Sequence, residues 1–513
     1  MRVLILSVTA GYGHHATANA IATVLRERGA TVEVVDVLEQ INRLLQEAFA
    51  KGYLLSTKYG KEVYKKLYTF LEQKGQRTSK YNFGNMAPAL MALRFEDDID
   101  AFNPDVIICT HVTAAHVVSE VKRNVKTAPA IGVVTDYTMH PFWEDATRVE
   151  HIVLASEHLI PRAVAIGIEE KRILPLGIPV HPRFNEKVPK HIAREQLSLR
   201  QDCPVVLVMG GSMGYGGIAK LVDSLKDTNM QILAVSGKNK RQYNKLMKLP
   251  KSPNLKVYGF VNNIDLMMDA ADCIITKPGG LTVTESMLKG LPMILTNPIP
   301  GQEERNTEFL TNLGLALSAS KTFPVSEALA IIFSHDKRRE LIAENMKLYA
   351  KPNATKDLCD FVYELGVQQY WNRFVAANNL DPETKYYETM YFGMTKELAD
   401  SLLELVLSGQ KKATASSVWA YEAEGQPFPQ VGNYSIVTDF DGNPRCIIKT
   451  TAVSTMAFRD MTFGICKREG EDETLESWQQ GHRKFFSMEA AELGYEFKED
   501  MPILFEDFEV VWK

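Results

Sequence analysis

The chain has 513 residues, of which 45% are apolar and 24% charged, a composition that excludes a disordered chain and is typical of folded globular proteins. No apolar run approaches the ~20 residues of a membrane-spanning helix. The formal net charge of −5 divides into +5 for residues 1–366 and −10 for residues 367–513, which indicates two units with different partners.

The six cysteines are scattered, with no CxxC pair and no histidine at metal-ligand spacing. This pattern favours reduced thiols packed as small apolar groups, and it predicts a cytoplasmic location.

Residues 1–180 alternate short apolar runs with amphipathic ones, which predicts a doubly wound α/β domain. The segment ANAIATVLRERG lies between the first two runs and predicts a helix that ends at Gly29. The predicted parallel strands are RVLILSV, TVEVVDV, PDVIICT, AIGVVTD and HIVLASE.

A second series of the same kind predicts another doubly wound domain over residues 181–366. The proline-rich segment PLGIPVHPRFNEKVPK links the two, and the helix ATKDLCDFVYELG closes the second at Gly366. Two such domains would face each other across a cleft. The predicted strands are PVVLVMGGS, QILAVSG, LKVYGFV, DCIITKPGG and PMILTN.

The pattern changes in residues 367–513, where we predict an α+β or small β-barrel domain. YWNRFVAANN and KELADSLLELVLSG predict helices. NYSIVTDFDGNPRCIIKTTAVSTMAF predicts a hairpin that turns at Asp441-Gly442.

Glycine-rich turns follow two strands of the second series, at Gly210-Gly211 and Gly279-Gly280. Such turns at a helix N-terminus present backbone N–H groups to a phosphate. Other residues of this series could bind the rest of a nucleotide and a sugar. A carboxylate can accept ribose hydroxyls, an aromatic ring can stack on a base, and amides and carboxylates can bind a hexose. We therefore predict a nucleotide-sugar site, with Glu285 on the ribose, Phe260 and Val261 at the base, and GQEERN on the hexose. The predicted donor-binding residues are Gly13, Ser212, Phe260, Val261, Gly279, Gly280, Thr282, Glu285, Gln302, Glu303 and Asn306.

The same stretches carry a family resemblance, through GGSMGYGG, GFVNNIDLMMDAADCIITKPGGLTVTES and KGLPMILTNPIPGQEERN. They resemble the plant monogalactosyldiacylglycerol synthases and, still more, the bacterial processive diacylglycerol glucosyltransferases. The resemblance covers residues 1–366 and implies an inverting, metal-independent glycosyltransferase of the two-Rossmann (GT-B) type. It implies no cofactor and no metal, with UDP-sugar as a substrate. In keeping with this, no DxD-like metal element stands near the glycine loops.

In the first domain, SVTAGYGHHATA and VTDYTMHPFW match the same family. The family's glycine-glycine-histidine element falls on Gly11, Gly13 and His14. An inverting transfer needs a base for the acceptor hydroxyl, and histidine titrates near neutrality. We therefore predict His14 as the base in preference to His15.

The same match brings in three further residues on the acceptor side of the predicted cleft. Asp136 either orients the imidazole of His14 or is itself the base. His140 and Trp143 would line the acceptor side.

The acceptor prediction rests on residues 51–80, which carry eight Lys or Arg and two Glu with interleaved tyrosines. Apolar residues recur at four-residue spacing, and Lys65 lies off that stripe while Tyr59 lies on it. A basic amphipathic helix of this kind is typical of an interfacial membrane anchor, and the alternative is a surface helix packed on its own domain. The resemblance implies lipid capture here, so we predict binding to an anionic membrane and a peripheral position at the inner face of the cell membrane.

Residues 368–513 resemble the ASCH domain, a small barrel related to RNA-binding PUA domains. The resemblance lies in SGQKKATASSVWAYEAEG, VGNYSIVTDFDGNPRCIIKTT and EGEDETLESWQQGHRKFF. It implies an RNA-binding module or an amidohydrolase with Lys411, Thr414 and Glu469 in its pocket. The EGEDE element lacks a second glycine, which leaves Glu471 as the alternative carboxylate. We predict a nucleoside or a short RNA end as the ligand.

Three functions remain open from the sequence. The first is transfer of glucose or galactose from a UDP-sugar to diacylglycerol or a related lipid. The others are a UDP-sugar epimerase, which shares the two-domain architecture, and a UDP-sugar-sensing RNA-binding protein.

Overall fold

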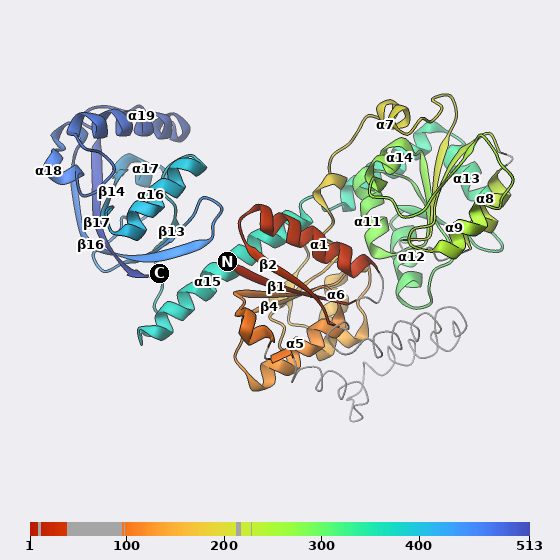
Figure 1. Ribbon diagram of the computed structural model, residues 1–513, viewed down its shortest axis with the longest axis horizontal. Coiled ribbons are helices and arrows are strands. Elements are labelled where there is room, and N and C mark those ends of the chain that lie inside the picture. The colour runs from red at the N-terminus through yellow and green to blue at the C-terminus, as the bar shows by residue number, and fades with distance from the viewer. Residues whose placement is uncertain (9–11, 38–94, 97, 212–216, 227) are drawn as a thin grey trace. The chain divides into compact units, whose positions relative to one another are not determined.

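The protein forms two compact units, seen in a computed structural model (Figure 1). One comprises Arg2–Glu27 and Thr31–Phe361, and the other comprises Met1, Arg28–Ala30 and Val362–Lys513. The residues described are 1–8, 12–37, 95–96, 98–211, 217–226 and 228–513.

The first sheet of the larger unit is parallel and has the order β2-β1-β3-β4-β5-β6. All the strands predicted in this series are confirmed, and the two-residue β6 is an addition that is too short to show a hydrophobic run. The strands are β1 (Arg2–Ser7), β2 (Thr31–Asp36), β3 (Val106–Cys109), β4 (Ala130–Val133), β5 (His151–Val153) and β6 (Ile173–Leu174).

Helices cover both faces of this sheet, with α1 (Tyr12–Glu27) on one face and α5 (Val112–Asn124) on the other (Figure 1). Leu4 and Leu6 of β1 pack in one hydrophobic core with Ala114 and Val117 of α5. The helix α6 (Ile160–Ala165) follows β5. The order of the sheet reverses between β1 and β3, which makes their carboxyl ends the expected ligand edge.

The second sheet is also parallel, with the order β12-β11-β10-β7-β8-β9. Its predicted strands are again confirmed, and β12 is an addition. Its order reverses between β7 and β10. The strands are β7 (Val205–Met209), β8 (Gln231–Val235), β9 (Leu255–Tyr258), β10 (Cys273–Thr276), β11 (Met293–Leu295) and β12 (Ala316–Ser318).

Alternate residues of the second sheet face two different cores, as its strand period requires. Val206 and Val208 pack with α8 and α13, whereas Leu207 and Met209 share a core with α10, α11 and α12. The helices of this part are α7 (Lys190–Gln196), α8 (Ile218–Leu225), α9 (Lys240–Leu246), α10 (Ile264–Ala270), α11 (Gly280–Lys289), α12 (Gln302–Asn312), α13 (Val325–Phe333) and α14 (Asp336–Tyr349).

One helix prediction is wrong: the helix predicted to close at Gly366 and the next predicted helix form one helix, α15 (Ala354–Ala377). Gly366 has no positive φ. A Cβ at this position would clash with the side chain of Met1, so close packing accounts for the glycine without a helix end. The domain boundaries at residues 180 and 366 stay predictions.

The smaller unit contains a five-stranded sheet, β13-β15-β16-β17-β14, whose pairs are antiparallel apart from β13 with β15. The predicted hairpin is confirmed, with Gly442 at a φ of 88° in its turn. The elements are β13 (Glu388–Met390), α16 (Lys396–Ser408), β14 (Ala413–Ser417), α17 (Val418–Glu424), β15 (Tyr434–Thr438), β16 (Pro444–Ala457), α18 (Phe463–Cys466), α19 (Leu475–Leu493) and β17 (Pro502–Trp512).

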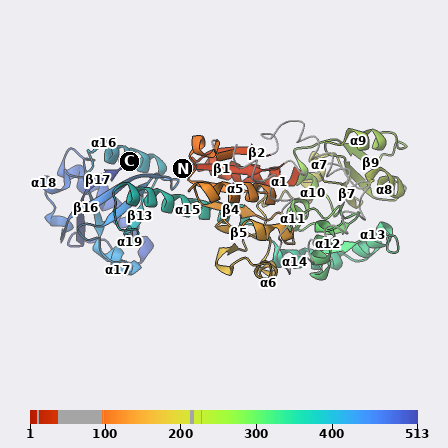
Figure 2. The same ribbon diagram turned by 90° about the horizontal axis from the view of Figure 1, so that it is seen from below.

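This sheet is covered on both sides, by α16 on one and α19 on the other (Figure 2). Phe508 packs with Leu403 and Val406 of α16, whereas Phe505 packs with Trp478 and Phe486 of α19. All six cysteines are free and buried, as their sequence pattern predicts.

Candidate active site

His14 lies at the carboxyl edge of the first sheet, where the strand order reverses. The sequence placed it on a glycine turn, but α1 begins at Tyr12, so His14 belongs to the first helical turn. Its ring Nδ1 lies 2.9 Å from the carbonyl oxygen of Thr110, which follows β3. Gly13 lies 3.9 Å, measured from an added Cβ, from Leu281 of α11. Gly11 falls outside the described residues.

The contacts of His14 define its tautomer. Because the Thr110 carbonyl can only accept, Nδ1 must carry the proton, and the Thr135 hydroxyl lies 3.0 Å from the same nitrogen. The lone pair is therefore on Nε2. Burial lowers the pKa of His14 from 6.5 to about 4, a shift that the Thr110 hydrogen bond opposes and the nearby His15 reinforces. At neutral pH the ring is therefore a neutral, proton-accepting imidazole.

The neighbouring histidines are held in other ways. His15 Nε2 lies 2.8 Å from a carboxylate oxygen of Asp36, at the end of β2. His111 caps the N-terminus of α5, and its ring meets that of His14 edge to face at a centroid distance of 4.6 Å. Burial and the charges of nearby histidines hold the pKa of His111 well below 6.5.

The predicted glycine turns meet at the carboxyl edge of the second sheet. Gly211 follows β7 with a φ of 67°, and Gly279 caps α11, whose first residue is Gly280. Between them lies Lys277, which sequence analysis left without a role although it stands inside the TKPGG motif. Ser212 falls outside the described residues.

The residues predicted for ribose and base lie on either side of this edge. Thr282 and Glu285 are half-buried in the first two turns of α11. Burial raises the pKa of Glu285 to about 8, with Arg183 lowering it and Asp265 raising it further. Phe260 exposes 47% of its surface, and Val261 beside it is half-buried. An exposed ring offers a stacking face for a base.

Two of the residues predicted to bind a hexose make other contacts in the structure. Glu303 accepts a hydrogen bond from the Ile299 N–H at 2.8 Å, and its other carboxylate oxygen pairs with Lys277. Asn306 is fully buried, and its amide donates to Asp136 at 2.8 Å and to the Pro278 carbonyl at 2.9 Å. Both amide N–H groups of Asn306 are thus used within the protein.

Asp136 joins the carboxyl edges of the two sheets. It follows β4 and accepts hydrogen bonds from Asn306 and, at 3.4 Å, from Gln302. The next residue, Tyr137, donates its N–H to Asn306 at 2.8 Å, and its hydroxyl lies 2.9 Å from that of Thr284. Burial raises the pKa of Asp136 to about 6, which the Asn306 hydrogen bond opposes. Residues 135–137 therefore connect the His14 ring to α11 and α12.

Of the predicted acceptor residues, Trp143 lies in a short 3₁₀ helix, η1 (Pro141–Asp145), and His140 is its N-cap. His140 caps it by accepting the Phe142 N–H at 3.2 Å. Trp143 exposes 5% of its surface, because it packs on Gly132, where a Cβ would lie 2.5 Å from the indole. Trp143 is thus a core residue, and the exposed aromatic ring, which sequence analysis missed, is Phe142.

The predicted membrane helix of residues 51–80, with Tyr59 and Lys65, falls outside the described residues. Within the part of the chain that is described, none of the helices combines the length and apolar composition needed to cross a bilayer. In the same part, no three or more His, Cys, Asp or Glu side chains are grouped so that they could hold a metal ion.

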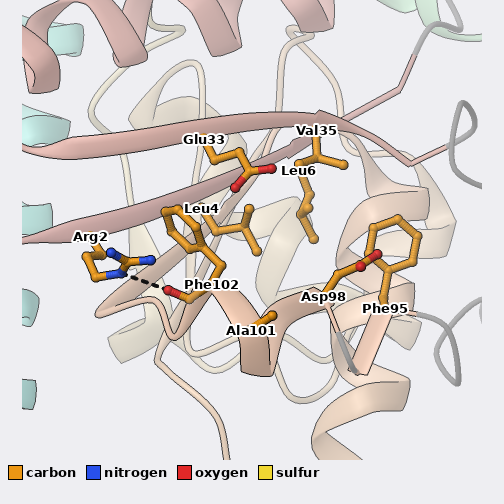
Figure 3. Close-up of a pocket in the computed structure, with 9 residues that line it drawn as sticks. All are labelled: Arg2, Leu4, Leu6, Glu33, Val35, Phe95, Asp98, Ala101 and Phe102. Atoms are coloured by element: carbon orange, nitrogen blue, oxygen red, sulfur yellow. Dashed lines mark hydrogen bonds between the residues drawn. The ribbon is translucent and has the colours of Figure 1, made fainter.

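A cavity of about 290 Å³ lies away from these edges, beneath β1 and β2 (Figure 3). Leu4, Leu6 and Val35 line it from the sheet, and Phe102 lies opposite, with its carbonyl accepting a hydrogen bond from Arg2 at 2.7 Å. Arg2, which lines the cavity, begins β1 and so lies at the strand end opposite to His14.

The smaller unit contains its own buried charged group. Lys411 exposes 2% of its surface, and it pairs with Glu471, the alternative carboxylate. Glu469, which is 1% exposed, accepts the indole N–H of Trp478 through Oε2, and His482 Nε2 lies 3.3 Å from the same oxygen. Glu469 Oε1 has no hydrogen-bond partner among the described residues.

The third predicted residue of this pocket, Thr414, lies on β14. It is half-buried and paired with Glu506 of β17. Sequence analysis missed Trp478 and His482, although both lie in the EGEDETLESWQQGHRKFF stretch that it singled out.

Sequence comparisons match both parts of the chain. Residues 14–180 match the profile of monogalactosyldiacylglycerol synthase, residues 205–356 the glycosyltransferase family 28 C-terminal domain, and residues 388–512 the ASCH domain. The processive diacylglycerol beta-glucosyltransferase of Bacillus pumilus is 30% identical over 372 residues, which cover 70% of this chain and 94% of that protein. The chain belongs to this family. The Bacillus subtilis relative is 29% identical over 355 residues, 67% of this chain and 90% of its own.

This glycosyltransferase also resembles solved structures. MurG of Acinetobacter baumannii is 17% identical and covers 71% of this chain and 99% of its own, with a TM-score of 0.47. An ASCH domain of Lactobacillus crispatus is 34% identical and covers 28% of this chain and 94% of its own, with a TM-score of 0.27. The fold is two parallel Rossmann-like sheets with an appended ASCH domain, as the sequence predicts.

Proposed function

We propose that this glycosyltransferase moves a hexose from a UDP-sugar to the hydroxyl of diacylglycerol or a related membrane lipid, with inversion at the anomeric carbon. The observation that carries the proposal is the tautomer of His14. A ring that donates from Nδ1 to Thr110 keeps its Nε2 lone pair for a proton, as an inverting displacement requires.

In the proposed reaction the lipid hydroxyl oxygen attacks the anomeric carbon while Nε2 takes the hydroxyl proton. The bond from that carbon to the β-phosphate oxygen breaks, and its electron pair leaves with UDP. The α11 N-terminus and the turns at Gly211 and Gly279 would receive the diphosphate. Glu285 would bind the ribose, and Phe260 would stack on the uracil.

The role of α12 is divided in this proposal. Gln302 and Glu303 are its candidates for the hexose hydroxyls, and Asn306 holds Asp136 and Tyr137 in place. The protein would act from the cytoplasm, on the inner face of the cell membrane, through the basic segment of residues 51–80.

The test is incubation with labelled UDP-glucose, UDP-galactose or UDP-N-acetylglucosamine and vesicles that contain diacylglycerol, followed by lipid extraction. Label in the lipid fraction that depends on diacylglycerol supports the proposal and identifies the sugar. Conversion of one UDP-sugar into another without any lipid would instead support the epimerase. Neither product, together with UDP-sugar binding, would support a sensor.

For the smaller unit we infer a pocket for a nucleoside or a short single-stranded RNA end. The observation that favours it is the buried Lys411 beside Glu469, whose Oε1 lacks a partner among the described residues. The charge of −10 over residues 367–513 disfavours long nucleic acid, whose binding depends on cations. Salt-sensitive binding of long RNA by this unit would contradict the inference.

A further inference from the structure

A partly exposed lysine lies at the carboxyl edge of the second sheet, and the proposed function gives it no role. Lys277 is the first residue after β10, and its side chain exposes 20% of its surface. It pairs with Glu303, whose side chain exposes only 9%. The Lys277 side chain is therefore held by an ion pair and still exposes part of its surface.

The lysine lies between the two glycine turns. A Cβ at Gly211 would come within 2.9 Å of Lys277 Cε, and a Cβ at Gly279 would lie 3.7 Å from Lys277 Nζ. Any side chain on Gly211 would therefore displace the lysine. The turn at Gly211 and the cap at Gly279 thus leave room for a cation at the N-terminus of α11.

Two carboxyl groups lie near Lys277, and an anion that binds at the N-terminus of α11 therefore needs the positive charge of this lysine. Glu303 pairs with Lys277. The negative charge of Glu303 raises the pKa of Asp136, and the positive charge of Lys277 lowers it. Without Lys277 these carboxylates would repel a diphosphate. The backbone N–H groups of a helix N-terminus carry only partial positive charge.

We propose that Lys277 binds the diphosphate of the donor and stabilises the negative charge that develops on the β-phosphate oxygen as the sugar leaves. This inference rests on the proposed function and adds a catalytic residue to it. The bond that breaks joins the anomeric carbon to that oxygen, and its electron pair stays on UDP. The positive charge of Lys277 neutralises the leaving group.

The test compares uridine, UMP and UDP binding by calorimetry in the wild type and in Lys277→Met. We expect uridine affinity to stay within twofold and UDP affinity to fall at least tenfold, with a smaller dependence on salt. The turnover number for sugar transfer should fall as well. Lys245→Met is the matched control, because it removes the same charge from an exposed position on α9 and should leave UDP affinity unchanged.

The double variant Lys277→Met/Glu303→Gln separates this role from a purely structural ion pair. If Lys277 served only to neutralise Glu303, removing both charges would restore UDP affinity, and that result would overturn the inference. Equal losses for uridine and UDP would overturn it too. Wild-type protein that binds neither nucleotide and transfers no label would instead overturn the proposed function itself.

Discussion

Replacement of His14 by alanine tests the centre of the proposed mechanism. The variant removes Nε2, the ring nitrogen on which the contact of Nδ1 with Thr110 leaves the lone pair, while the α11 and α12 contacts stay intact. Loss of a general base typically costs about 10²–10⁴-fold in rate. We expect a loss in that range in the turnover number, with UDP affinity within a few-fold of the wild type.

The pH profile of the wild type sharpens this test. Because burial lowers the pKa of His14 to about 4, the imidazole is neutral throughout the range from pH 5 to 8. The acid limb of kcat/KM that His14 causes should therefore centre near pH 4 and not near 6.5. Donor turnover is measured with diacylglycerol vesicles over this range, after checking that the protein remains folded.

His15→Ala is the matched control, because it removes an adjacent ring whose Nε2 lies against Asp36 at the end of β2. It should retain at least a third of the wild-type rate. Near-normal turnover in His14→Ala would refute the reasoning, and so would equal losses in the two variants.

Four further predictions concern stability, donor binding, the smaller unit and membrane binding. Because burial lowers the pKa of His14 to about 4, the unfolded chain binds a proton at this residue below pH 6.5 that the folded chain does not bind. The contribution of His14 to stability is therefore full above pH 6.5 and falls by up to about 3 kcal/mol towards pH 4. Between pH 7.5 and 5 the melting temperature of the wild type should fall relative to that of His14→Ala, and equal shifts in the two proteins would contradict this. Glu285→Ala should raise the donor KM more than tenfold. Glu285→Gln should raise it less, because a pKa of about 8 leaves this carboxyl protonated at pH 7. Unchanged UDP binding in the alanine variant would show that Glu285 does not bind the donor. A chain of residues 1–366 should retain sugar transfer, because the larger unit ends within α15 at Phe361, and a folded but inactive fragment would show that the smaller unit is needed. We expect weaker co-sedimentation with anionic vesicles when glutamine replaces Lys58, Lys61, Lys65 and Lys66, since each basic group near such a surface contributes about 1 kcal/mol. Unchanged sedimentation would favour the alternative prediction, a surface helix packed on its own domain.

The predicted strands of the two parallel sheets could be read from the sequence because buried parallel strands are continuous apolar runs. RVLILSV and PVVLVMGGS each form a strand next to which the order reverses, and the polar residues gather at the carboxyl edge of these strands. The glycine turns were predictable for a different reason: Gly211 has a positive φ, a conformation that favours glycine. Helix ends were less predictable: Gly366 looks like a helix stop, yet it is a packing position against Met1.

The sequence by itself determined which residues can do the chemistry, because imidazole, carboxylate and glycine have properties that do not depend on the fold. Only the tertiary structure decided what each of them is free to do. His14 has its proton on Nδ1 because the carbonyl of Thr110, which follows β3 and is 96 positions away in the chain, lies against it. The Asn306 amide donates to Asp136 because the segment after β4 packs on α12, and Trp143 is buried because Gly132 leaves room for its ring. These partners come from distant strands, and hydrogen-bond geometry and burial exist only once the chain has brought them together.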